Sequence, residues 1–261
     1  MKKAIYFGSL PETLHLEERF KLLKEAGYHG TEIGTVGMEE VVRLKNEADR
    51  VGIEIHSIMN SLHWKFPLTE LEVKDRCIKN VEVSIEYARI VGADAVLLVP
   101  GVVNEKVSYK VAYERSFKVI KEEILPMATE KKVTIAIENV WNKFLLSPLE
   151  FTSFIDSFES PYIGAYFDVG NILLYGYPQD WIRTLGKRIK KVHIKGFNIE
   201  KRDFCYLLEG SIDWKEVENA LIEVGYDGYI TAEMSPYPSH PEQMIRDTSK
   251  HMDLIFKFKD T

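Results

Sequence analysis

One sequence unit recurs along the chain and limits the folds that it can adopt. The unit is an amphipathic helical stretch, a glycine at its end and a short run rich in β-branched residues. The glycines of its four copies are Gly27, Gly52, Gly92 and Gly225. A glycine readily takes the left-handed conformation in which many helices end, so a strand can begin a few residues later. Such repetition indicates consecutive β–α units around a parallel sheet.

Eight apolar runs are candidates for strands, and eight segments with helical periodicity alternate with them. The expected strands are Ala4–Phe7, Gly30–Gly34, Glu54–Met59, Ala95–Val99, Val133–Asn139, Tyr162–Asp168, Lys191–Lys195 and Tyr229–Met234. The expected helices are Leu14–Ala26, Met38–Val51, Leu71–Val91, Tyr109–Thr129, Pro148–Phe158, Pro178–Leu185, Trp214–Val224 and Met244–Phe256. This alternation predicts an α/β fold, a (β/α)8 TIM barrel, as a single domain over residues 1–261. A doubly wound open sheet is disfavoured because no GxGxxG turn follows an early strand.

Local signals support several helix starts. The spacing of a capping box, or a proline at the first helical position, is found at Thr69 with Glu72, Asp213 with Glu216, Ser147-Pro148 and Tyr177-Pro178. Pro126 lies inside the fourth expected helix and is expected to kink or end it.

Composition excludes several classes of protein. The chain has 261 residues, 34 Lys and Arg against 40 Asp and Glu, a net charge of −6 and two cysteines. No apolar run approaches the roughly 18 residues of a membrane span, so we expect a cytoplasmic protein without a membrane partner. Cys77 and Cys205 lie far apart without a CxxC motif, which disfavours a disulfide framework or a thiolate metal site. A negative chain without a basic run also disfavours nucleic acid as a partner.

Four ionisable residues close apolar runs in the last four expected strands: Glu138, Asp168, His193 and Glu233. In a TIM barrel, residues at the carboxyl ends of the strands converge on one face. The three carboxylates, brought together with an imidazole, would repel one another there unless a cation lay between them. Mixed oxygen and nitrogen ligands favour Mn²⁺, Co²⁺, Mg²⁺ or Zn²⁺. The sequence therefore predicts one divalent metal site, although each residue taken alone could instead be an N-cap or an ion-pair partner.

The same residues carry a resemblance to a known family. The motifs Ile-Glu-Asn, Phe-Asp-Val-Gly-Asn, Val-His-Ile-Lys-Gly and Ala-Glu-Met on successive strands resemble the sugar-phosphate isomerase/epimerase group of xylose-isomerase-like TIM barrels, of the D-tagatose 3-epimerase and L-ribulose-5-phosphate 3-epimerase type. Gly30-Thr31-Glu32-Ile33 and Val99-Pro100-Gly101 fit the same group. The resemblance extends over the whole chain.

The resemblance implies a metal-dependent epimerase or isomerase of a ketose, a ketose phosphate or a keto sugar acid. Glu138, Asp168, His193 and Glu233 would hold one divalent ion, with Mn²⁺ preferred. Glu138 and Glu233 would also be the catalytic acid and base, which remove a proton next to the carbonyl while the metal stabilises a cis-enediolate. Relatives often form homodimers or homotetramers, and we expect a small sugar as the substrate.

Five further residues are candidates for substrate binding. Asn171 stands where tagatose-type epimerases commonly carry a histidine, and Lys195 and Arg202 follow the seventh strand, where they could bind a phosphate or carboxylate. His56 on the third strand could touch substrate or be structural, and Trp141 could stack on a sugar or only pack. Separately, Glu32 on the second strand is either a partner of the site or an ion-pair partner inside the barrel. His63, Trp64 and Phe66 are expected in a loop over the barrel mouth.

Other functions are compatible with parts of this pattern. A sugar or keto-inositol dehydratase would use the same metal site and proton abstraction but expel hydroxide. A DNA-repair endonuclease of the same barrel type would need further His and Asp ligands for a three-zinc cluster and a basic groove, which the sequence lacks. A hydride-shift aldose isomerase would need a second metal site, for which no clear residue set is present. A non-catalytic sugar-binding protein would not need all four ligands.

Overall fold

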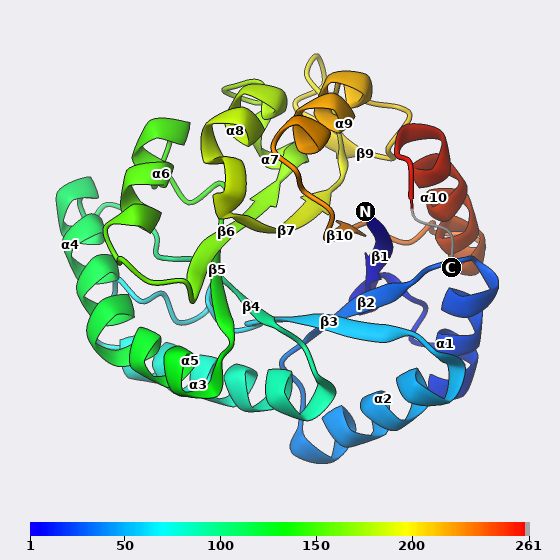
Figure 1. The fold of residues 1–261 in the computed structure, drawn as a ribbon, viewed down its shortest axis with the longest axis horizontal. Helices are drawn as coiled ribbons and strands as arrows, with labels where there is room; N and C mark the ends of the chain where they lie inside the picture. Colours follow the sequence, from blue (N-terminus) through cyan, green and yellow to red (C-terminus); the bar gives the residue numbers. More distant parts are fainter. Residues whose placement is uncertain (259–261) are drawn as a thin grey trace.

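The computed structural model describes residues 1–258 and contains a closed barrel of parallel strands (Figure 1). The strands of the barrel are β1 (Lys2–Tyr6), β2 (Gly30–Gly34), β3 (Glu54–Met59), β4 (Ala95–Leu98), β5 (Thr134–Glu138), β6 (Ile163–Asp168), β7 (Ile189–Ile194) and β10 (Tyr229–Ala232). Each strand pairs with the next along the chain, and β1 pairs with β10 to close the ring. The predicted TIM barrel is confirmed. Residues 259–261, which the predicted domain includes, lie outside the described part of the chain.

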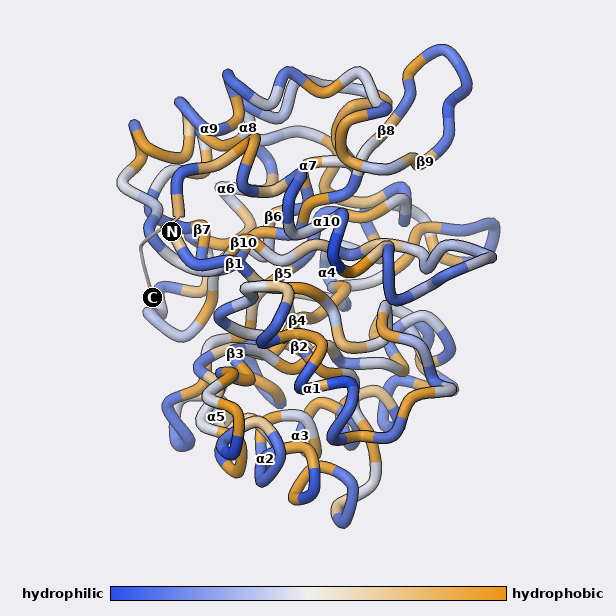
Figure 2. Tube along the Cα trace, turned by 90° about the vertical axis from the view of Figure 1, so that its right-hand side faces the viewer, coloured by the Kyte–Doolittle hydropathy of each residue, from blue (hydrophilic) through white to orange (hydrophobic). Residues whose placement is uncertain are grey.

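Helices surround the barrel and connect its strands. They are α1 (Leu16–Glu25), α2 (Met38–Val51), α3 (Lys74–Val91), α4 (Tyr109–Val119), α5 (Leu125–Lys131), α6 (Pro148–Asp156), α7 (Val169–Ile172), α8 (Pro178–Leu185), α9 (Trp214–Glu223) and α10 (Pro241–Ile255). Along these helices hydrophobic and hydrophilic residues alternate, as Figure 2 shows, because one face of each packs on the barrel. None of the helices within residues 1–258 combines the length and apolar character that a membrane crossing requires.

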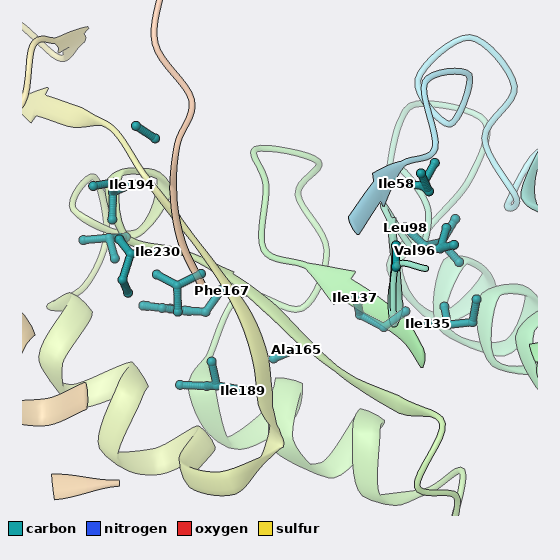
Figure 3. Packing of buried hydrophobic residues seen from close by; sticks show 14 of the residues in the cluster. Ile58, Val96, Leu98, Ile135, Ile137, Ala165, Phe167, Ile189, Ile194 and Ile230 are labelled. Carbon is teal, nitrogen blue, oxygen red and sulfur yellow. The ribbon is translucent and has the colours of Figure 1, made fainter. Parts of the chain in front are cut away.

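Strand alternation separates two groups of buried side chains. Residues such as Val96, Leu98 and Phe167 belong to the large core between the strands and the outer helices (Figure 3). Their neighbours Ala95, Leu97, Ala136 and Tyr166 form a separate cluster inside the barrel. Successive side chains of a strand point to opposite faces, so one register decides which residues line the interior. The polar residues at the strand ends share the inward register.

Three of the four helix-start signals predicted from the sequence lie at the observed start of a helix. The side chains of Ser147 and Asp213 accept hydrogen bonds from the first turns of α6 and α9, and Pro178 is the first residue of α8. The prediction for Thr69 is wrong, because α3 begins only at Lys74. The Thr69 hydroxyl instead donates to the carbonyl of Val102, 3.1 Å away, and so fastens two loops together.

Pro126 does not end the fourth predicted helix. It follows a short segment in which the α-helix changes to a π-helix. A π-helical turn over Ile120–Ile124 joins α4 to α5, and Pro126 occupies the first turn of α5. A proline lacks a backbone N–H, and a helix tolerates it best in its first turn. The fourth predicted helix is therefore divided into two α-helical segments joined by this wider turn.

A small hairpin that the sequence analysis did not predict follows β7. Its strands are β8 (Gly196–Asn198) and β9 (Asp203–Cys205), and it projects beyond the barrel (Figure 2). A side chain at Gly196 could not fit, because a Cβ atom there would lie 2.4 Å from the carbonyl oxygen of Tyr206. Gly196 therefore lets the backbone at Cys205 and Tyr206 pack closely against the start of the hairpin.

Candidate metal centre

The four predicted ligands come from adjacent strands and meet at the barrel mouth. Glu138 and Asp168 are the last residues of β5 and β6, His193 is the next-to-last residue of β7, and Glu233 directly follows β10. One ligand atom from each of the four lies within 4.8 Å of the others. Among the His, Cys, Asp and Glu side chains of residues 1–258, these four form the group whose potential ligand atoms lie this close together. The four residues could therefore hold one metal ion.

The chemistry of the donor set fits a divalent cation. Asp168 and His193 are completely buried, and Glu138 is 7% exposed. The buried Oδ2 atom of Asp168 accepts no hydrogen bond from the described residues. Grouped buried carboxylates are costly unless positive charge compensates them. Three carboxylates and one imidazole supply hard oxygen donors and one nitrogen donor, a set that suits Mn²⁺, Mg²⁺ or Zn²⁺.

Lys195 supplies part of the compensating charge. Its ammonium group lies 3.1 Å from Asp168 Oδ2 and donates a hydrogen bond to Glu233 Oε2. Burial disfavours the charged form of Lys195, but Asp168 and Glu233 outweigh it and raise its pKa. The predicted substrate-binding residue thus lies inside the cluster and points at two of the ligands.

Burial and charge act differently on the acidic ligands. Burial raises the pKa of Glu138 to about 7, against the opposing effect of His193. Burial also raises the pKa of Asp168, although Lys195 counteracts it. At Glu233 burial is outweighed by Lys195 and His193, and the pKa is lowered.

His193 lies between two carboxylates. Its Nε2 atom is 2.8 Å from Glu32 Oε1, and its Nδ1 atom is 3.1 Å from Glu138 Oε1. Burial lowers the pKa of His193, but the two carboxylates together raise it well above the usual value. Glu32 is completely buried, and it also accepts a hydrogen bond from Ser57 Oγ.

Asn171 lies beside the cluster but is held by the protein itself. Its backbone N–H donates to Asp168 Oδ1 at 2.7 Å, and its side-chain amide donates to the carbonyl of Asn139 at 2.9 Å. Asn139 in turn accepts from the backbone N–H of Asp168 through Oδ1 at 2.7 Å. This network fixes the Asp168 carboxylate at the junction of β6 and α7.

Trp141 forms an aromatic wall with the hairpin. Its indole ring stacks on Phe204 at a centroid distance of 4.7 Å, and its N–H donates to the carbonyl of Asn171 at 2.9 Å. The Lys195 ammonium lies 5.1 Å from the centre of the Phe204 ring. Trp141 and Phe204 are 42% and 40% exposed, so part of each ring remains open to a ligand.

The structure does not bring His56 and Arg202 into the cluster. His56 lies in the middle of β3, one layer below the cluster toward the amino ends of the strands. It stacks on Tyr229 at 4.1 Å and shares a hydrogen bond with Thr231. This environment matches the structural alternative for His56. Arg202 lies in the exposed turn between β8 and β9 and makes no side-chain hydrogen bond or ion pair with the described residues.

A cavity adjoins the metal ligands on the side of β1 and β10. It has a volume of about 380 Å³, and its lining includes Tyr6, Ser9, Lys195, Phe204 and Glu233. Tyr6 and Phe204 were not singled out from the sequence as site residues. The position of Tyr6 at the carboxyl end of β1 is the signal that could have found it.

Comparison with known families agrees with this geometry. A family model described as the xylose isomerase-like TIM barrel matches residues 20–255. The chain belongs to this family. The resemblance inferred from the strand-end motifs is thereby confirmed, and the four candidate ligands lie within the matched region.

Similar proteins include solved structures and a curated relative. The chain superposes on a D-tagatose 3-epimerase-like protein with a TM-score of 0.82 and 20% identity, over 98% of this chain and 97% of that one. It superposes on an L-ribulose 3-epimerase with a TM-score of 0.81 and 16% identity, over 97% and 93% of the two chains. An uncharacterized protein of Methanocaldococcus jannaschii is 26% identical over 190 residues, or 70% of this chain. The match spans 61% of the length of that relative.

Proposed function

We propose that the protein is a divalent-metal-dependent epimerase or isomerase of a ketose, a ketose phosphate or a keto sugar acid. The convergence of Glu138, Asp168, His193 and Glu233 at the barrel mouth carries the proposal. Two similar structures are those of a D-tagatose 3-epimerase-like protein and an L-ribulose 3-epimerase, which supports the choice of reaction class. Mn²⁺ is the proposed ion, with Co²⁺, Mg²⁺ or Zn²⁺ as alternatives.

Glu138 and Glu233 are the proposed acid and base. They project from β5 and from the end of β10, with the two ligand-bearing strands β6 and β7 between them. A sugar held over the cluster would therefore meet one carboxylate from each side, as the exchange of a proton between two faces of a carbon requires. The bound metal would supply Lewis acidity at the carbonyl and its neighbouring hydroxyl.

The remaining side chains of the mouth are proposed to orient the sugar. The exposed parts of Trp141 and Phe204 offer an apolar face against the carbon skeleton of a sugar. Burial, with Glu32 and Glu233, raises the pKa of Tyr6, which keeps its hydroxyl protonated as a hydrogen-bond donor into the adjoining cavity. Lys195 and Asn171 remain proposed substrate contacts, and a phosphate or carboxylate would have to compete with the acidic ligands for Lys195.

A substrate screen in D₂O tests the proposal. Purified protein with Mn²⁺ is incubated with free ketoses, ketose phosphates and keto sugar acids, and products are followed by NMR and mass spectrometry. We expect an epimer or isomer with one deuterium bound at the carbon next to the carbonyl. A product that retains the substrate hydrogen would instead indicate a hydride shift, and loss of water would indicate a dehydratase.

The controls separate the protein's own activity from contamination. Glu138→Gln protein, purified in the same way, should give no product and no exchange.

Location in the cytoplasm and assembly as a homodimer or homotetramer remain predictions, which fractionation and sedimentation would check. Neither nucleic acid nor a membrane is proposed as a partner.

A further inference from the structure

Glu32 is a buried carboxylate that the proposed reaction does not use. It belongs to β2, on the opposite side of the barrel from β6, and it is not one of the four converging ligands. Even so, its Oε1 atom lies 2.8 Å from His193 Nε2, across 161 positions of sequence. A carboxylate with no exposure would be costly without several donors around it.

The surroundings hold the Glu32 carboxylate in one orientation. Ser57, its partner in the pairing of β2 with β3, donates a hydrogen bond to Oε2. The hydroxyl of Tyr166 lies 3.2 Å from Ser57 Oγ and also interacts with Glu32. The Tyr166 ring packs against the imidazole of His193 at a centroid distance of 4.3 Å. Glu32 and the histidine ring are therefore fixed relative to each other.

The two nitrogens of His193 consequently face different partners. Nε2 faces Glu32, whereas Nδ1 faces Glu138, which is one of the converging ligands. A histidine binds metal through a nitrogen that carries no proton, and the hydrogen bond of the other nitrogen decides which one that is. The second ring nitrogen of a metal-bound histidine typically donates its N–H to a nearby carboxylate, and Glu32, which is not one of the four converging ligands, faces Nε2 in this way.

We propose that Glu32 is a positioning residue of the metal centre, which holds the Nε2 proton of His193 and thereby presents Nδ1 as the metal ligand. The inference rests on the proposed metal centre and adds a residue from the first half of the chain to it. A side chain that hydrogen-bonds to a metal-bound histidine typically contributes about 10–100-fold to metal affinity. Glu32 would act on metal binding without touching the substrate.

Zinc binding by a matched pair of variants tests this role. Glu32→Gln keeps the shape of the side chain but removes its charge, and we expect roughly 10–100-fold weaker Zn²⁺ binding by calorimetry. Glu218→Gln is the control, because Glu218 is also buried but lies on α9, where it accepts a hydrogen bond from the backbone N–H of Lys257. Its affinity for Zn²⁺ should equal that of the unmodified protein. Ser57→Ala, which removes a donor to Glu32 but leaves His193 intact, should give a smaller loss and serves if Glu32→Gln does not fold.

Histidine NMR gives a readout independent of activity. In ¹⁵N-labelled, Zn²⁺-loaded protein we expect His193 to show a protonated Nε2 and a metal-bound Nδ1. Coordination through Nε2, or unchanged Zn²⁺ affinity in both the Glu32→Gln and Ser57→Ala proteins, would overturn the inference. If the unmodified protein bound no Zn²⁺, the metal centre and this inference would both fail. If it bound Zn²⁺ through Nδ1 but converted no sugar, the proposed function alone would fail.

Discussion

The ammonium group of Lys195 lies 3.1 Å from the Oδ2 atom of Asp168, among the side chains proposed to hold a metal ion. It also bonds to Glu233, so one cation already neutralises part of the acidic cluster. A divalent ion bound to the same carboxylates would be repelled by this ammonium group. We therefore expect Lys195 to stabilise the metal-free protein and to weaken metal binding.

We predict that Lys195→Met strengthens Mn²⁺ binding by roughly tenfold, the equivalent of about 1.4 kcal/mol of lost repulsion. Titration calorimetry or competition with a chelating dye would measure it. Lys191→Met is the matched control, since Lys191 is also buried and pairs with Asp94 at 2.6 Å toward the amino ends of the strands. Weaker Mn²⁺ binding by Lys195→Met would show that the ammonium orients the ligands rather than competing with the ion.

Neutral replacement of either proposed proton carrier should abolish turnover. Glu138→Gln and Glu233→Gln each remove a metal ligand charge and an acid or base, so we expect turnover to fall by about 100-fold or more. Circular dichroism should show an intact barrel. The control is Glu150→Gln on α6, outside the cluster, which should retain activity. Near-normal turnover in the Glu138 or Glu233 variant would remove that residue from the proposed mechanism.

Metal removal should lower stability as well as activity. A ligand that binds only the folded protein stabilises it by about 2.7 kcal/mol at roughly 100 times its Kd. For a chain of this size we expect Tm to rise by roughly 5–10 °C when Mn²⁺ is added to chelator-treated protein. Scanning calorimetry of the unmodified and Asp168→Asn proteins would check this. An equal rise in the variant would place the bound ion elsewhere.

His63 should make the protein less stable in acid. Burial lowers its pKa to about 4, despite the opposing charge of Glu233, whereas an unfolded histidine titrates near 6.5. Between these values the unfolded state binds more protons than the folded state, so stability decreases as pH falls from about 6.5 to about 4. The full effect is roughly 3 kcal/mol.

Denaturant unfolding at pH 7 and pH 5 would measure this dependence. The His63→Asn protein keeps an acceptor for the N–H of Val99, which lies 3.4 Å from His63 Nδ1, but cannot take up a proton. Its stability should therefore change less between the two pH values. An identical pH dependence in both proteins would assign the acid sensitivity to other groups, such as the buried His56, whose pKa burial also lowers.

The barrel and the four candidate ligands were predictable because they depend on local pattern. Four helices end at or next to the glycines of the repeated unit, and each ligand closes an apolar run, so strand alternation places it inside the barrel. The level at which a side chain lies along the barrel axis is harder to predict from sequence. His56 points into the barrel as a site residue would. However, it stacks on Tyr229, the first residue of β10, and so lies nearer the amino ends of the strands than the four ligands do.

Contacts between distant strands were the least predictable part of the site. The pairing of Glu32 with His193 depends on barrel closure, which brings β2 and β7 face to face across the interior. The β8–β9 hairpin was missed because three-residue strands carry too little pattern to recognise. The start of α3 was misplaced because Thr69 resembles a helix cap but bonds to a neighbouring loop.

Pairing of β1 with β10 makes assembly of the site a late event. The ligands all come from residues 138–233, and the last of them follows the strand that closes the ring. During synthesis, the growing chain cannot enclose a metal ion until β10 has emerged and displaced water from the exposed edges of β1 and β7. A protein truncated before β10 would lack a ligand and would also expose two unpaired strand edges, which favour aggregation. Loss of the chain from β10 onward should therefore remove metal binding and solubility together.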